Sequence, residues 1–124
     1  MGVLISWTSE MLLGLSEIDD QHVAIVRKLN QTNDSLLAGK ARSALVREWH
    51  ALLEMLREHF AAEERLMRQE NCPSYERHKC EHDYLLRMAG RVPLSPAATS
   101  LIREWLITHL NGSDRQMASE LRRL

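Results

Sequence analysis

The sequence predicts an all-α protein, an up-down-up-down antiparallel four-helix bundle with an N-terminal arm and a short C-terminal helical tail. Four stripes of apolar residues recur at helical spacing, turn-rich segments separate them, and no alternating strand pattern competes with them. Because the connections are short and the helices are of similar length, consecutive helices are expected to be antiparallel neighbours. No shift in composition marks a boundary, so we expect residues 1–124 to form a single domain.

The first two helices are expected at 18–38 and 41–70. Asp19 or Asp20 can cap the start of the first helix, and Gly39 follows its end. The second helix ends before Pro73, which cannot continue it.

The last two helices are expected at 74–90 and 96–111. The fourth begins at Ser95-Pro96, a capping residue followed by a first-turn proline. A further apolar stripe predicts the helical tail at 114–124. Residues 1–17 form the arm, and we expect Trp7 and the cluster at 11–13 to anchor it on the bundle.

The composition argues against several partners. The net charge is −1, and acids alternate with bases as on a solvated helix face, so no nucleic acid partner is expected. No apolar run approaches the ~20 residues that a membrane span needs, and no secretory signal is visible. Cys72 and Cys80 lack a disulfide or CxxC pattern, and we expect reduced thiols in a cytoplasmic protein. Cys80 is expected to point away from the face that carries His78 and His82.

Seven side chains that can bind metals fall on the apolar stripes. They are His22, His59, Glu63, His78, His82, His109 and Asp114. Residues four apart on a helix share a face, so the pairs at 59/63 and 78/82 can each converge on one metal centre. Burying such groups in a bundle without a partner is unfavourable.

His109 and Asp114 are five residues apart, which is about 140° around a regular helix. Both can face the interior only if the helix is interrupted between them. Asn111-Gly112-Ser113 lies there, and this sequence favours either a left-handed turn or a widened turn.

Each of these signals is weak when taken alone. A single core histidine is more often a satisfied polar group than a ligand, and His50 is expected to be that or solvent-exposed. The methionines are more often core residues than ligands.

All seven positions on core stripes together predict a dinuclear centre. If Glu63 and Asp114 bridge two octahedral metals with an oxo or hydroxo group, one position stays open on the metal with two histidines. The donor set suits iron or manganese, and zinc stays open.

The chain resembles the hemerythrins, and it is most like their bacterial branch, the bacteriohemerythrins. The likeness runs from Trp7 to about Asp114, and it rests on Trp7, Gly14, Ile18-Asp19-Asp20-Gln21-His22, His59-Phe60-Ala61-Ala62-Glu63-Glu64, Pro73, His78, His82, Trp105-Leu106, His109 and Asp114. The chain departs from the family at Cys72, where a tyrosine often precedes the proline. The connection at 90–96 also looks short, which puts affinity and autoxidation rate in question.

The resemblance implies two iron ions (Fe²⁺/Fe³⁺) with dioxygen as a ligand. His78, His82 and His109 would hold the saturated iron, while His22 and His59 would hold the iron with the open position. Glu63 and Asp114 would bridge them. The pocket for dioxygen would be lined by Ile25, Phe60, Trp105 and Leu110.

The expected function is reversible dioxygen binding, for transport, storage, delivery or sensing, with an unknown separate protein as a possible partner. The alternatives are a di-iron enzyme that handles peroxide or nitric oxide, or an iron-storage or structural module. An enzyme needs an acid–base side chain in the pocket, and none is evident at the expected lining positions. The ligating histidines also need hydrogen-bond acceptors, and Gln21, Glu81 and backbone carbonyls are the candidates.

Overall fold

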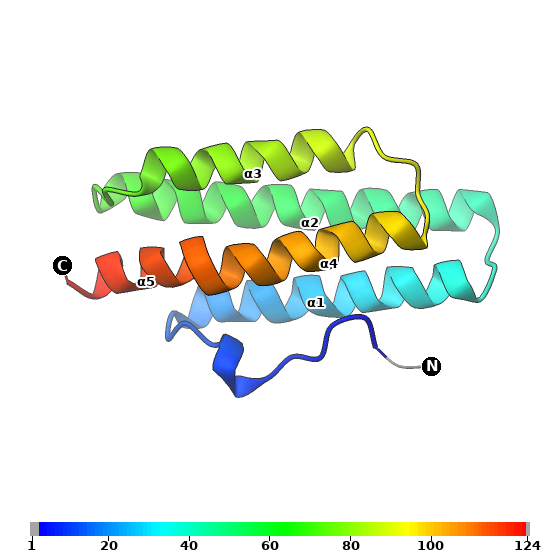
Figure 1. Ribbon diagram of the computed structural model, residues 1–124, viewed down its shortest axis with the longest axis horizontal. Coiled ribbons are helices and arrows are strands. Elements are labelled where there is room, and N and C mark those ends of the chain that lie inside the picture. The colour runs from blue at the N-terminus through cyan, green and yellow to red at the C-terminus, as the bar shows by residue number, and fades with distance from the viewer. Residues whose placement is uncertain (1–2, 124) are drawn as a thin grey trace.

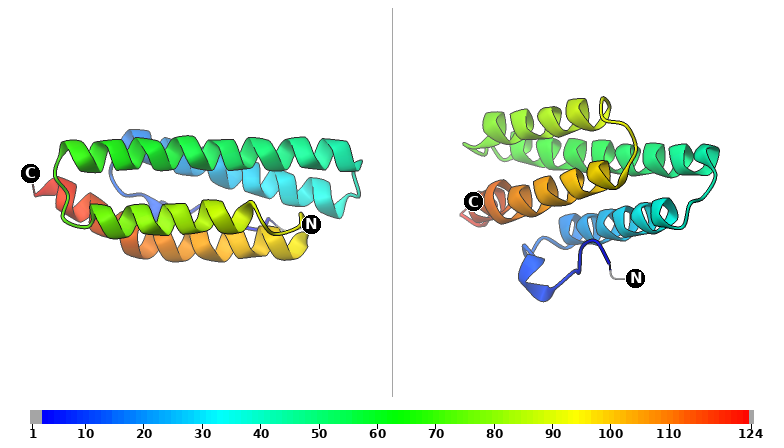
Figure 2. Two further views of the ribbon diagram at one scale, coloured as in Figure 1. Left: turned by 90° about the horizontal axis from the view of Figure 1, so that it is seen from above. Right: turned by 45° about the vertical axis from the view of Figure 1, so that its right-hand side comes forward.

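The computed structural model describes residues 3–123, which form four long helices and a helical extension (Figure 1). The long helices are α1 (Ser16–Leu37), α2 (Arg42–Gln69), α3 (Tyr75–Ala89) and α4 (Pro96–His109). α1 and α3 each pack against both α2 and α4. Successive helices run in opposite directions, as the view from above and the oblique view show (Figure 2). The predicted all-α bundle is thus confirmed.

Asp19 connects the arm to the bundle through hydrogen bonds. It does not cap α1, although the sequence had led us to expect that Asp19 or Asp20 would. The helix begins earlier, at Ser16, and the position before it offers no side-chain cap. The Asp19 carboxylate instead accepts hydrogen bonds from the N–H groups of Leu13 at 2.8 Å and Gly14 at 3.1 Å. Gly14 has φ +83°, a conformation that glycine adopts without strain where the arm turns into α1. Asp20 is exposed.

Three other helix ends, those after α1 and α2 and the start of α4, follow the expected turn chemistry. Gly39, after α1, has φ +71°, and Asn71 has φ 53° in the turn between α2 and α3. At the start of α4, the Ser95 hydroxyl accepts the N–H of Ala98 at 3.2 Å, and Pro96 occupies the first turn. The predicted capping at Ser95 is therefore confirmed.

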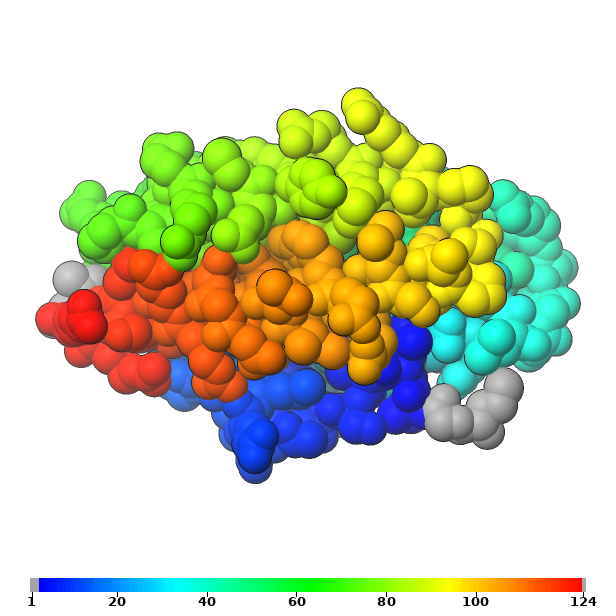
Figure 3. Space-filling view, viewed as in Figure 1, coloured from blue at the N-terminus to red at the C-terminus, as the bar shows by residue number. Residues whose placement is uncertain are grey.

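The N-terminal arm lies along the bundle and contains one short 3-10 turn, η1 (Ser9–Met11). In the space-filling view it follows the edge beside α4 (Figure 3). The amide of Asn30 holds it by bonding both the N–H and the C=O of Ile5, at 2.9 and 2.8 Å. Within the expected anchor at 11–13, Leu13 is buried but Leu12 is exposed. Residues 1 and 2 of the expected arm, and residue 124 of the expected tail, lie outside the described residues.

Buried apolar side chains form two separate clusters along the bundle. We call the first the distal core; it includes Leu29, Leu52, Leu56, Leu85 and Ile102. The second, the proximal core, lies where the arm, the α2–α3 turn and α5 (Arg115–Arg122) meet; it includes Leu13, Ile18, Met67, Cys72, Leu110, Met117 and Ala118. The predicted ligands of α1 and α2 fall between residues of the two cores: between Ile18 and Ile25 on α1, and between Leu56 and Met67 on α2. None of the helices in residues 3–123 has the length and apolarity to cross a membrane.

Candidate metal centre

All four long helices contribute to one buried polar cluster between the two cores. No member of the cluster has more than 8 % of its surface exposed. The members are His22 from α1, His59 and Glu63 from α2, His78 and His82 from α3, His109 from α4, and Asp114 from the segment after α4. The structure therefore brings together all seven side chains that the sequence singled out.

Glu63 divides its two carboxylate oxygens between two groups of histidines. Oε1 lies 3.1 Å from Nε2 of both His78 and His82. Oε2 lies 2.9 Å from Nε2 of His59 and 3.4 Å from Nε2 of His22. This arrangement places one oxygen toward each group.

Asp114 repeats this division from the opposite side of the cluster. Its Oδ1 lies 3.0 Å from Nε2 of His78 and 3.1 Å from Nε2 of His109, while Oδ2 lies 3.3 Å from Nε2 of His22. Two carboxylates thus lie between a three-histidine group (residues 78, 82 and 109) and a two-histidine group (residues 22 and 59). The arrangement suits two metal ions that share both carboxylates.

A widened turn places Asp114 in the cluster. The segment η2 (Leu110–Asp114) is a single π-helical turn between α4 and α5. In such a turn the backbone hydrogen bonds span five residues, so His109 and Asp114 can lie on one side of the helix. The sequence had allowed either a left-handed turn or a widened turn here, and the structure has the widened turn. Within residues 3–123 the glycines with positive φ are Gly14 and Gly39, which lie outside this segment.

Three of the five histidines use their outer ring nitrogen in a side-chain hydrogen bond. With Nε2 directed at the centre, Nδ1 carries the hydrogen and donates it outward. His59 Nδ1 lies 2.6 Å from Gln21 Oε1. His109 Nδ1 lies 2.8 Å from Glu81 Oε1. Both acceptors had been named as candidates from the sequence.

Glu64 is an acceptor that sequence reasoning missed. Its Oε2 lies 2.8 Å from Nδ1 of His82. The register of the antiparallel pair α2 and α3 sets this contact, and the only sequence signal is a second acid directly after Glu63. A helix-by-helix reading of the sequence does not supply that register.

Several buried atoms of the cluster have no hydrogen-bond partner among the described residues. They are Nδ1 of His22, Nδ1 of His78, Oε2 of Glu63 and Oδ1 of Asp114. In addition, Nε2 of His82 lies 3.1 Å from Nε2 of His109, although neither Nε2 has a hydrogen to donate when Nδ1 carries it. Buried polar groups are rarely left without partners. Facing lone pairs of imidazole and carboxylate are the donors that an iron ion takes, so these residues fit a di-iron group.

The carboxylates make this interior favourable for positive charge. Burial alone would lower the pKa of His22, but the adjacent carboxylates of Asp114 and Glu63 raise the pKa to about 9. The pKa of His78 is raised to about 9 in the same way. Burial alone would raise the pKa of Glu63, yet the neighbouring histidines, led by His59, hold it well below its ordinary value. A metal cation can stabilise these buried carboxylates in the same way as the positively charged histidines do.

A small cavity of about 30 Å³ adjoins the two-histidine group. It is lined by Trp7, His22, Ile25, Val26, His59, Phe60, Leu106, His109, Leu110 and Asp114. That volume is about the share of one water molecule in the liquid, so the cavity suits a very small ligand.

Three of the four residues predicted for the dioxygen pocket, namely Ile25, Phe60 and Leu110, line this cavity. Trp105 is not in the lining. It stacks on the ring of His109 instead, with centroids 4.3 Å apart and planes at 14°. Trp7, expected only as an anchor of the arm, does line the cavity, because the arm folds back over α1.

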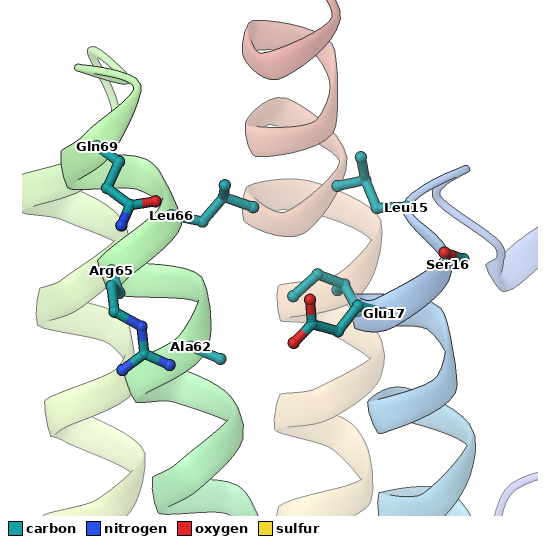
Figure 4. Close-up of a pocket in the computed structure, with 8 residues that line it drawn as sticks. Leu15, Ser16, Glu17, Ala62, Arg65, Leu66 and Gln69 are labelled. Atoms are coloured by element: carbon teal, nitrogen blue, oxygen red, sulfur yellow. The ribbon is translucent and has the colours of Figure 1, made fainter.

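Two larger hollows lie near the centre. One, of about 340 Å³, opens between the start of α1 and the end of α2, where Glu17, Arg65 and Gln69 surround it (Figure 4). None of the seven cluster residues lines it. The other, of about 160 Å³, lies between α1 and α2 and shares Ile25 and His59 with the small cavity. These two side chains therefore lie between the small cavity and this outer hollow.

The remaining candidate donors lie away from the centre. Cys80 is exposed, as its position relative to the histidines predicted, and Cys72 is buried in the proximal core. His50 is exposed on α2. The centre is thus built from imidazoles and carboxylates alone.

Comparisons with known proteins agree with this geometry. Residues 13–121 match the model of the hemerythrin HHE cation binding domain. A bacteriohemerythrin of Methylococcus capsulatus is 29 % identical over 122 residues, covering 90 % of this chain and 92 % of that protein. A hemerythrin-like protein of Naegleria gruberi is 31 % identical over 110 residues, covering 88 % and 87 %.

A solved structure shows the same fold. The crystal structure of a wild-type hemerythrin superposes with a TM-score of 0.87 at 27 % identity, covering 95 % of this chain and 98 % of that one. Because the domain match spans most of the sequence and the cluster has the residues of a non-heme di-iron site, the chain belongs to the hemerythrin family.

Proposed function

We propose that this protein binds dioxygen reversibly at a non-heme di-iron centre. The observation that carries the proposal is the position of Glu63 and Asp114. Each lies between the same two groups of histidines, and one of these groups faces a cavity of about 30 Å³. A centre held by shared carboxylates beside a space for one small molecule suits a diatomic ligand.

The chain's residues divide between two iron ions in this proposal. His78, His82 and His109 would hold one ion. His22 and His59, which line the cavity, would hold the other beside it. Bound ferrous iron supplies the electrons that dioxygen takes up on binding and returns on release. Both carboxylates would keep the ions at a fixed separation.

The walls of the cavity keep the site dry. Ile25, Phe60 and Leu110 are each at most 8 % exposed. Apolar walls exclude water and slow proton entry, which otherwise promotes irreversible oxidation. Ile25 has a particular role, because it separates the cavity from the outer hollow between α1 and α2. Reversible binding depends on this separation.

The lining of the cavity favours binding over turnover. Its ionisable side chains are His22, His59, His109 and Asp114, and all four belong to the proposed ligand set. No further acid or base lines the cavity within residues 3–123. General acid–base catalysis of peroxide chemistry requires such a group. The proposal is therefore a binding protein and not an oxidase.

Anaerobic loading with ferrous iron tests the proposal. We expect two irons per chain and a visible band that appears with dioxygen and disappears when dioxygen is removed, over repeated cycles. His22→Ala should abolish the cycle, while His50→Ala, which changes an exposed histidine outside the centre, should leave it intact. Steady consumption of dioxygen in the presence of a reductant would instead indicate an enzyme. Failure to take up iron would overturn the ligand assignment.

A further inference from the structure

The outer hydrogen bonds of the centre are distributed unequally between the two histidine groups. In the three-histidine group, His82 donates to the carboxylate of Glu64 and His109 donates to the carboxylate of Glu81, each at 2.8 Å. The two-histidine group has no such carboxylate. There His59 bonds the neutral amide of Gln21 at 2.6 Å.

The remaining two outer positions do not offset this difference. Nδ1 of His22 and Nδ1 of His78 have no hydrogen-bond partner among the described residues, so one unpaired histidine falls in each group. Among the side chains within residues 3–123 that accept from these Nδ1 atoms, the two negatively charged ones, Glu64 and Glu81, therefore both lie on the three-histidine side.

A carboxylate acceptor changes the metal-binding nitrogen of an imidazole. When Nδ1–H donates to a negatively charged oxygen, the ring becomes more basic and Nε2 becomes a stronger donor to a metal. An amide oxygen carries no net charge, and the hydrogen bond it accepts is weaker. The three-histidine position therefore stabilises a higher metal charge than the two-histidine position.

Neighbouring cations weaken this effect without cancelling it. Nζ of Lys79 lies 3.7 Å from Glu64, and Nε of Arg77 lies 3.9 Å from Glu81. Both cationic side chains are well exposed, at 39 % and 61 %, so solvent and salt screen them. The Glu64 side chain is only 13 % exposed, and its bond with His82 is screened less.

Glu81 has additional support for its negative charge. The Ser113 hydroxyl donates to Oε1 at 2.7 Å, the same oxygen that accepts from His109. Ser113 belongs to the π turn, so the turn that places Asp114 also holds this acceptor.

We propose that Glu64 and Glu81 are positioning residues that make the three-histidine position the preferred site of a trivalent ion. The inference rests on the two-iron centre of the proposed function. When one electron from an electrode enters the diferric centre, the ferric ion is retained at the three-histidine position and the ion beside the cavity becomes ferrous. No bond forms or breaks in this step. The open position thus belongs to the ion that is reduced first.

The first readout is the pair of midpoint potentials of the iron-loaded protein, for the first and the second electron, measured anaerobically. Glu64→Gln and Glu81→Gln keep an oxygen acceptor and remove its charge. Each should weaken the binding of ferric iron at the three-histidine position by about tenfold, a shift of about 59 mV to more positive potential for the second electron, which enters that position. Gln21→Glu adds a carboxylate on the other side and should stabilise ferric iron there, shifting the potential of the first electron to more negative values. Glu76→Gln removes an exposed charge from α3 and should have no effect.

The second readout needs no redox chemistry. The metal-free protein is loaded with one equivalent each of Ga³⁺ and Zn²⁺, and anomalous scattering from crystals locates each ion. We expect Ga³⁺ at the three-histidine position in the unaltered protein. Gln21→Glu combined with Glu64→Gln should reduce or reverse this preference. A merely structural role for the carboxylates would not move the two ions.

Iron content is measured first, so that the two levels of the proposal can be separated. An unaltered protein that takes up no iron contradicts the proposed function itself. If the protein and its variants bind two irons, but Glu64→Gln and Glu81→Gln keep the original potential and the ion placement, the inference is wrong. If Glu64→Gln does not fold, Glu81→Gln and Gln21→Glu decide: shifts of opposite sign support the inference, and unchanged potentials overturn it.

Discussion

Leu52 in the distal core and Glu63 in the metal centre lie about three turns apart on α2, and each has 0 % of its surface exposed. Burial favours the first and disfavours the second. A buried leucine stabilises the fold by about 1.5–3 kcal/mol. A buried carboxylate loses its hydration energy, and nearby positive charges must offset that loss. One helix thus carries both an apolar core and a charged one.

The difference teaches how such a centre can exist in a small bundle. The distal core supplies stability through apolar contacts that need no cofactor. The centre contains buried atoms without hydrogen-bond partners, among them Oε2 of Glu63 and Oδ1 of Asp114, and it gains full compensation only when cations bind. We therefore expect the distal core to hold the helices in register and the metal to hold the centre.

The largest expected effect comes from Glu63→Ala. Both groups of histidines lose a shared carboxylate, so iron content should fall from two per chain to below one. The metal-loaded protein should lose at least about 3–5 kcal/mol in free energy of unfolding, because imidazoles remain buried without their counter-charge. Metal analysis and urea unfolding measure these changes. Glu76→Ala, on the exposed face of α3, is the control, and two irons retained in Glu63→Ala would contradict the ligand assignment.

Insertion of one alanine between Gly112 and Ser113 tests the spacing that the π turn sets. The added residue puts Asp114 six positions after His109 and rotates it by about 100° away from the centre. Iron affinity should fall by roughly 10–100-fold, as judged by competition with a chelator. Gly112→Ala is the matched control: an added Cβ meets nothing within 4 Å and φ is not positive, so iron binding should persist. Equal affinity in the insertion variant would mean that Asp114 is not required.

Leu52→Ala separates the distal core from the centre. The large-to-small change should reduce the free energy of unfolding by about 2–5 kcal/mol, because a cavity replaces a fully buried side chain. Iron stoichiometry should stay at two per chain in the folded protein. Urea unfolding and metal analysis of the same sample are the measurements. If the variant is fully folded but has lost iron, the distal core and the metal centre are coupled and do not act independently.

Ser95→Ala should have the smallest effect. It removes the side-chain cap on the N–H of Ala98 at the distal end of α4 and should cost about 1 kcal/mol of unfolding free energy. Ser100→Ala, at an exposed position inside the same helix, is the control. Thermal unfolding resolves the difference, and the optical spectrum of the iron-loaded protein should be identical in both variants.

Much of the centre could be predicted because its signals are local. The spacing of four between His59 and Glu63, and between His78 and His82, fixes a shared face for each pair on any regular helix. The Ser95-Pro96 cap is equally local. Signals that depend on neighbouring helices were weaker: Asp19 bonds the arm and does not cap α1, and Trp105 stacks on His109 outside the cavity lining.

The sequence by itself determined the helical class, the order of the helices and the seven polar residues of the centre, because periodicity and capping act over a few residues. Only the tertiary structure decided how these residues meet. The division of the Glu63 and Asp114 oxygens, the contact between Glu64 and His82, and the choice of a π turn over a left-handed one depend on helix register. Register is set by the packing of side chains across helices, and no single segment encodes it.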